Sequence, residues 1–173
     1  MSTDELNEVW DIYDRSLTKI TEKRRSEPLN KGEYHLVVSI FIYHMKNQLL
    51  LQKRSMAKLN YPGYWEGSAG GSALKRETHV EAIKREVAEE LDLKLAITEA
   101  DFYMRCIEEN WIEDWFVFQT DFQVTELQLQ VEEVERVKLF DFEKASQQLK
   151  QFGIQPYKKQ LKQANRLIQE NKK

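Results

Sequence analysis

Three glutamates stand within five residues of one another in the middle of the chain: Glu86, Glu89 and Glu90. Around them, apolar residues recur at three- and four-residue spacing, which predicts a helix over Thr78–Leu91. At 100° per residue, the three carboxylates fall on a face beside the apolar stripe. Clustered carboxylate oxygens are what a hard divalent cation binds. Taken alone, however, an acidic helix face is usually only solvated, and the neighbouring Lys84 and Arg85 are able to neutralise it.

The spacing upstream is far more specific than the acidic face. Five residues separate Gly71 from Glu77, and seven more separate Glu77 from the pair Arg85-Glu86. From residue 71 to residue 93 the pattern resembles the Nudix box, G-x5-E-x7-R-E-U-x-E-E-x-G-U, where U is a bulky aliphatic residue. Six fixed identities at roughly 5–7% usage each coincide by accident on the order of once in 10⁷–10⁸ starting points. The chain is therefore identified as a member of the Nudix superfamily.

Two residues depart from the pattern that the family shows. Asp92 replaces the glycine just past the helix, where a left-handed backbone is expected; Asp tolerates this conformation better than most residues with a side chain. Arg76 replaces a glycine that is common before the loop glutamate, and we expect it to face an anionic substrate. Neither departure removes an expected metal ligand.

The resemblance implies a role for each matching residue. The expected metal ligands are Glu86, Glu89, Glu90 and the backbone carbonyl of Gly71. Glu77 and Arg85 are expected to fix the loop against the helix, as a well-formed metal site requires. The implied reaction is attack of water on a phosphorus atom of a P–O–P linkage. Mg²⁺ is the expected cofactor and Mn²⁺ its substitute.

Residues outside the box are expected to complete the site for a small diphosphate, by default a nucleoside diphosphate derivative. Glu113 and Glu133 stand in segments where Nudix enzymes often place an extra carboxylate. We take Glu113 as the candidate general base, although an exposed surface position is the ordinary alternative for both. Arg54 has the reach to bind phosphate. Trp65 offers a ring for stacking on a planar group, but a core position explains it equally well.

Segments outside the box, among them residues 10–14 and 32–41, resemble the branch of the superfamily that includes type 1 isopentenyl diphosphate isomerase. This resemblance covers roughly residues 8–145. That enzyme uses a cysteine in the loop before the box and a metal held by histidines and glutamates. In this chain Gly70 and Ser72 stand at the positions of the cysteine and of a loop histidine, although His35 and Glu113 match ligand positions. The isomerase alternative is therefore disfavoured. Another alternative, a non-catalytic nucleotide-binding module, is disfavoured because every glutamate of the box is present.

Further elements are predicted on both sides of the central helix. A nearly continuous run of β-branched and aromatic residues predicts a buried strand at His35–Tyr43. Ser55–Gly71 is predicted as one long loop. The remaining predictions are an N-terminal hairpin at about residues 8–21 with strands Val9–Tyr13 and Ser16–Ile20, strands Leu49–Lys53, Phe102–Ile107, Trp115–Phe122 and Arg136–Phe140, and helices at about residues 142–152 and 157–169. This order predicts the α/β (α+β) class: a single Nudix-like domain, residues 1–173, in which an α/β/α sandwich encloses a mixed sheet.

The bulk composition excludes several other classes of protein. Net charge is −3, from 26 basic and 29 acidic residues, which is too balanced for binding a nucleic-acid polymer. No apolar run approaches the roughly 20 residues that cross a bilayer. Cys106 is the single cysteine, so no intrachain disulfide forms, and we expect a cytoplasmic protein in which this thiol is packed in a strand. The N-terminal hairpin and the aromatic residues offer an interface for a homodimer.

Overall fold

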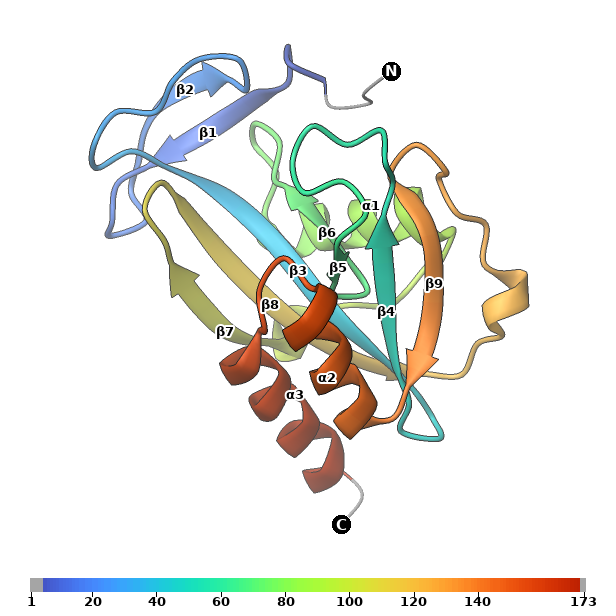
Figure 1. Ribbon diagram of the computed structural model, residues 1–173. Coiled ribbons are helices and arrows are strands. Elements are labelled where there is room, and N and C mark those ends of the chain that lie inside the picture. The colour runs from blue at the N-terminus through green and yellow to red at the C-terminus, as the bar shows by residue number, and fades with distance from the viewer. Residues whose placement is uncertain (1–4, 172–173) are drawn as a thin grey trace.

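One mixed β-sheet forms the centre of the computed structural model, which describes residues 5–171 (Figure 1). Within that range the sheet has nine strands: β1 (Val9–Tyr13), β2 (Lys19–Arg24), β3 (Tyr34–His44), β4 (Leu49–Arg54), β5 (Trp65–Glu66), β6 (Ala69–Ser72), β7 (Phe102–Ile107), β8 (Trp111–Thr120) and β9 (Val134–Phe140). The two longest, β3 and β8, lie side by side and are parallel. β6 pairs antiparallel with β3, so the glycine-rich segment lies against the central strand.

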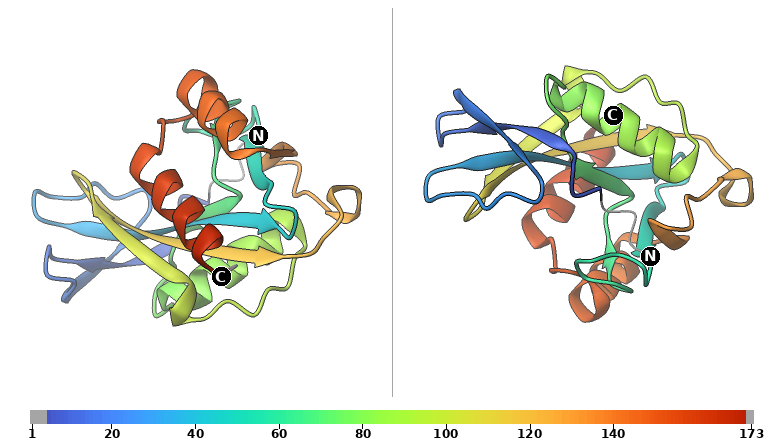
Figure 2. Two further views of the ribbon diagram at one scale, coloured as in Figure 1. Left: turned by 90° about the horizontal axis from the view of Figure 1, so that it is seen from below. Right: turned by 90° about the horizontal axis from the view of Figure 1, so that it is seen from above.

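Helices cover both faces of this sheet. Figure 2 shows α1 (His79–Leu91) on one face and α2 (Phe142–Phe152) with α3 (Lys158–Glu170) on the other. Each face has its own apolar core, which confirms the predicted α/β/α sandwich. Among residues 5–171, no helix has the length and apolar character needed to cross a membrane.

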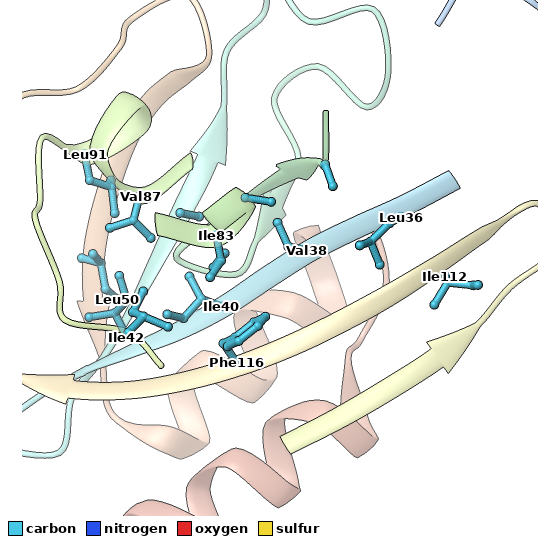
Figure 3. Packing of buried hydrophobic residues seen from close by; sticks show 14 of the residues in the cluster. Leu36, Val38, Ile40, Ile42, Leu50, Ile83, Val87, Leu91, Ile112 and Phe116 are labelled. Atoms are coloured by element: carbon cyan, nitrogen blue, oxygen red, sulfur yellow. The ribbon is translucent and has the colours of Figure 1, made fainter. Parts of the chain in front are cut away.

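The core beneath α1 is built from the predicted apolar stripe. Ile83, Val87 and Leu91 are fully buried and point toward the side chains of β3 and β4 (Figure 3). Val38, Ile40 and Ile42 of β3 supply the opposite wall because alternate strand residues point to the same face. The stripe therefore fixes which side of α1 is left for the acidic residues.

Both ends of α1 are set by local chemistry. The Thr78 hydroxyl accepts the Glu81 backbone N–H (3.2 Å), and the Glu81 carboxylate accepts the Thr78 backbone N–H (2.8 Å), which is a reciprocal capping box. At the other end Asp92 adopts φ 56° and ψ 32°, the left-handed conformation predicted for this position. The non-glycine residue in the box is thus accommodated without altering the fold.

Several predicted boundaries were wrong. The second strand of the hairpin is Lys19–Arg24 rather than residues 16–20, because a turn closed by Asp14 occupies residues 14–18. The predicted loop over residues 55–71 contains β5 and the start of β6. The strand predicted from residue 115 begins at Trp111, so Glu113 and Asp114 lie within β8. Polar residues in that strand had concealed its first half.

Candidate active site

Gly71 on β6 lies against the Glu86 side chain of α1. A Cβ atom at this position would lie 2.3 Å from Oε1 of Glu86, so any other residue here requires the Glu86 carboxylate to move. Glycine leaves that space to the carboxylate. Two neighbouring cavities, described below, share Gly71 in their lining.

Arg85 binds the loop before α1 to the acidic face. Its Nε donates to Oε1 of Glu77 (2.7 Å) and its Nη2 donates to Oε2 of the same carboxylate (3.0 Å). Nη1 donates to Glu86 (2.8 Å) and to Glu89 (3.2 Å). Burial opposes the charge of Arg85, but Glu77 and Glu86 outweigh it and raise the pKa of Arg85. The supporting contact predicted between Glu77 and Arg85 is thus present.

Glu90 is buried and the side chain of Glu86 is only 12% exposed, although two carboxylates repel one another. Burial raises the pKa of Glu86 to about 7, despite the opposing charge of Arg85. Burial, followed by the charge of Glu86, also raises the pKa of Glu90 well above its usual range. Glu90 accepts one hydrogen bond from Nε2 of Gln52 (2.8 Å). A cation between the carboxylates would remove both penalties, so the arrangement fits a hard metal ion.

The three glutamates do not already surround one point. Across residues 5–171, no three acidic, histidine or cysteine side chains are grouped closely enough to hold a metal ion as they stand. Arg85 holds Glu86 and Glu89, whereas Gln52 holds Glu90. Glu89 is half exposed and able to turn.

Two neighbouring cavities meet at Gly71, which lines both of them. The smaller, of about 520 Å³, is lined by Glu86, Glu89 and Glu90. The larger, of about 660 Å³, includes Trp10, Trp111, Trp115, Tyr61 and Tyr157 in its lining. Arg25 and Arg54 line both cavities.

The two candidate base residues lie in different cavities. Glu113 lines the larger cavity, is 6% exposed and accepts a hydrogen bond from Oγ of Ser39 (2.8 Å). Burial raises its pKa to about 7, partly offset by that hydrogen bond. Glu133 lines the smaller cavity beside the three glutamates and forms an ion pair with Lys58. The ordinary surface position considered for Glu113 is therefore wrong.

The three residues predicted to bind substrate have different surroundings. Arg54 lines both cavities, where Nη1 contacts Glu66 (2.9 Å). Trp65 is 6% exposed and packs edge-on against Phe140 in the core beneath α2, so it has the core position that was its alternative. Arg76 is exposed, and neither of the two cavities includes it in its lining. Of the three, only Arg54 lines the cavity that contains the box glutamates.

Three features of the site carried no signal in the sequence. Gln52, which donates to Glu90 and to Glu66 (3.2 Å), follows three leucines in β4, and nothing local indicates its partners. Arg25 reaches both cavities from the end of the hairpin. His79, at the start of α1, contacts the buried Asp114 (2.6 Å). Each depends on partners distant in the sequence.

The residues matched to the isomerase lie together in the larger cavity. His35 stacks on Trp10 (ring centroids 4.2 Å apart), and burial lowers its pKa to about 4. Gly70, Ser72 and Glu113 line the same cavity. Cys106, by contrast, lies on β7 beside Gln160 and outside that lining. Along the described chain, no thiol therefore stands where an acid cysteine would act.

Comparison with known proteins agrees with this geometry. The family model of the Nudix domain matches residues 33–162. An uncharacterised Nudix hydrolase of Listeria innocua is 40% identical over 139 residues (79% of this chain, 82% of the relative). One from Listeria monocytogenes is 44% identical over 131 residues (73% and 76%). An isopentenyl-diphosphate Delta-isomerase of Burkholderia multivorans is 31% identical over 100 residues (57% and 56%).

Solved structures show the same fold. The crystal structure of DR0079 from Deinococcus radiodurans superposes with a TM-score of 0.67, at 17% identity, over 86% of this chain and 92% of that one. The match of the family model to most of the chain, together with the Listeria relatives, shows more than the fold. This chain belongs to the Nudix family of pyrophosphohydrolases.

Proposed function

We propose that this enzyme uses Mg²⁺ to hydrolyse the diphosphate linkage of a nucleoside diphosphate derivative. The observation that carries the proposal is the opening of the three box glutamates into a cleft beside a large aromatic-lined cavity. A cavity of about 660 Å³ lies within the range of small-molecule sites, which is on the order of 300–1,000 Å³. The metal neutralises phosphate charge and lowers the pKa of the attacking water when it is bound.

The residues divide the task between binding and orientation. Glu86, Glu89 and Glu90 hold the ion, with Mn²⁺ as a substitute for Mg²⁺. Arg25 and Arg54, which line both cavities, are placed to bind phosphate oxygens where the cavities meet. The aromatic cavity then receives the organic group of the substrate, with stacking as its main contribution.

Proton transfer is assigned to Glu113. Its pKa of about 7 allows it to accept and release a proton near neutral pH, as a general base must. Ser39 fixes one of its oxygens. The cytoplasmic location and the homodimer predicted from the sequence are retained as proposals, and measurement of molecular mass in solution tests the latter.

Glu90→Gln is the variant that tests the proposed function. Gln keeps the size of Glu90 but supplies no negative charge, so we expect loss of at least about 100-fold in turnover. Glu132→Gln is the matched control because Glu132 is exposed and borders neither of the two cavities. Nucleotide sugars, dinucleotides, nucleoside triphosphates and prenyl diphosphates are incubated with Mg²⁺, and products are identified by mass.

Two outcomes contradict this proposal. Near-normal turnover in Glu90→Gln would remove Glu90 from the metal site. Conversion of isopentenyl diphosphate to its dimethylallyl isomer, with no hydrolysis of any nucleotide, would establish the isomerase alternative instead. Circular dichroism of both variants confirms that each is folded.

A further inference from the structure

The N-terminal hairpin is attached to the loop that carries Glu77. On β1, the buried carboxylate of Asp11 accepts the backbone N–H of Arg76 through Oδ2 (2.8 Å). The carbonyl of Val9 accepts the backbone N–H of Lys75 (2.8 Å). On β2, Glu22 forms an ion pair with Nζ of Lys75 (2.6 Å). Lys75 and Arg76, in the loop that carries Glu77, are thus held by a hairpin some sixty residues earlier in the chain.

The backbone at Arg76 has a conformation that its side chain disfavours. Its φ is +63°, in the left-handed region that glycine adopts readily and other residues adopt at a cost in free energy. A carboxylate that accepts the backbone N–H of this residue selects that conformation over the extended alternatives. Asp11 therefore stabilises a turn that the sequence of the loop alone does not favour.

The conformation of Arg76 helps to set where Glu77 points, together with the Leu74 backbone N–H, which donates to Oε2 of Glu77 (2.8 Å). Glu77 follows directly, and both of its oxygens bind Arg85, at 2.7 and 3.0 Å. Arg85 in turn contacts Glu86 and Glu89. A change of φ at Arg76 would swing the Glu77 side chain away and release the arginine.

From this chain of contacts we propose that Asp11 is a positioning residue for the metal-binding glutamates. Its carboxylate fixes the left-handed turn at Arg76, which aims Glu77 at Arg85 and so orients Glu86 and Glu89. The inference rests on the proposed function, since it presumes that these glutamates bind the metal. Asp11 lines neither of the two cavities and has no direct part in the reaction.

A purely structural role for Asp11 makes a different prediction. Its other oxygen, Oδ1, forms an ion pair with Lys19 on β2 (2.7 Å), which joins the strands of the hairpin. If that ion pair were what mattered, removing Lys19 would have the same effect as removing Asp11. Lys19→Met breaks the ion pair and leaves the hydrogen bond to Arg76 intact, so it is the matched control.

The test measures Mn²⁺ binding by electron paramagnetic resonance on the substrate-free protein, with kcat and KM measured in parallel. For Asp11→Ala we expect Mn²⁺ affinity and kcat to fall by about 10-fold or more, with little change in KM, as for other residues that orient metal ligands. Asp11→Asn keeps an acceptor oxygen and should lose less. Lys19→Met should bind Mn²⁺ as the unchanged protein does.

A second substitution relieves the strain directly. In the Asp11→Ala background, Arg76→Gly removes the penalty on the left-handed turn and should restore part of the lost Mn²⁺ affinity. Wild-type affinity in Asp11→Ala, an equal loss in Lys19→Met, or no recovery with Arg76→Gly would each overturn the inference.

Hydrogen exchange provides a readout that needs neither metal nor activity. The neutral oxygen of Asn is a weaker acceptor than a carboxylate, so the Arg76 amide should exchange faster in Asp11→Asn than in Lys19→Met. Equal rates would also overturn the inference. This comparison remains available if Asp11→Ala does not fold. Failure of the unchanged enzyme to hydrolyse any diphosphate would instead contradict the proposed function, while Mn²⁺ binding and exchange still report on Asp11.

Discussion

The carboxyl group of Glu113, on β8, is buried. Replacing Glu113 with Gln should therefore change how the free energy of unfolding depends on pH. Glu113 is 6% exposed and accepts a hydrogen bond from Ser39. Burial raises its pKa from 4.5 to about 7. A shift of that size corresponds to about 3 kcal/mol of difference between folded and unfolded states, at roughly 1.4 kcal/mol per pKa unit.

The sign follows from proton linkage. Between pH 4.5 and about 7, Glu113 is protonated in the folded protein and ionised in the unfolded chain. The folded state binds more protons in this window, so its stability falls as pH rises. The contribution is fully present below pH 4.5 and is lost as pH passes through about 7. Above that pH, the fold holds a buried carboxylate.

The assay is urea unfolding followed by tryptophan fluorescence at pH 5, 6, 7 and 8, with a chelator present to keep metals away from the other carboxylates. Gln cannot ionise, so Glu113→Gln should gain stability relative to the unchanged protein from pH 5 to pH 8, by up to about 3 kcal/mol. Glu132→Gln, at an exposed position outside both cavities, is the control for replacing a glutamate with glutamine. A difference for Glu113→Gln that is constant across the four pH values would refute the reasoning.

Two further predictions concern neighbouring parts of the fold. Asp114 raises the pKa of His79 and Glu99 adds to the effect, so the stabilisation is fully present below pH 6.5 and is lost as pH rises through the folded-state pKa. His79→Gln should therefore lower the free energy of unfolding more at pH 6 than at pH 9. An NMR titration midpoint of His79 at or below 6.5 would contradict this prediction. Gly71→Ala places a Cβ 2.3 Å from Oε1 of Glu86, so displacement of that ligand should lower turnover about 10-fold or more. Unchanged kinetics would mean that Glu86 is free to move away.

The central helix could be predicted from the sequence because all of its determinants are local. The apolar stripe gave its buried face, and the capping residues Thr78 and Glu81 lie three positions apart. Asp92 closes it in the left-handed conformation expected from its place in the box. The acidic face followed from the same periodicity. Where every determinant lies within one or two turns of chain, pattern and structure agree.

The rest of the site depends on contacts that no local pattern records. Glu113 and Asp114 interrupt the apolar alternation of β8, and their burial is possible only because Ser39, Arg105 and His79 come from elsewhere in the chain to meet them. The same holds for Gln52 beneath Glu90. A buried polar residue looks like a surface residue until its partner is known.

The loop before α1 that carries Glu77 shows the same dependence on distant residues. Arg76 stands where a glycine would adopt the left-handed turn unaided, and the turn is instead supported by Asp11 from the N-terminal hairpin. The sequence suggested a substrate contact for Arg76 because an arginine beside an expected phosphate site is a natural anion ligand. What sets Arg76 apart in the structure is its left-handed backbone, which the sequence pattern does not reveal.

Burial of Glu86 and Glu90 has a consequence for the Glu90→Gln variant beyond lost turnover. Each carboxylate raises the free energy of the metal-free fold, because burial and mutual repulsion disfavour its charge. A fold selected for stability alone would place an amide or an apolar residue at position 90, whereas binding a cation requires the charge. Glu90→Gln should therefore unfold at a higher temperature than the unchanged protein when a chelator is present, and Mn²⁺ should reduce or reverse that difference by stabilising only the unchanged protein. If Glu90→Gln were less stable without metal, Glu90 would be a structural residue of the core, and its loss of turnover would no longer identify a metal ligand.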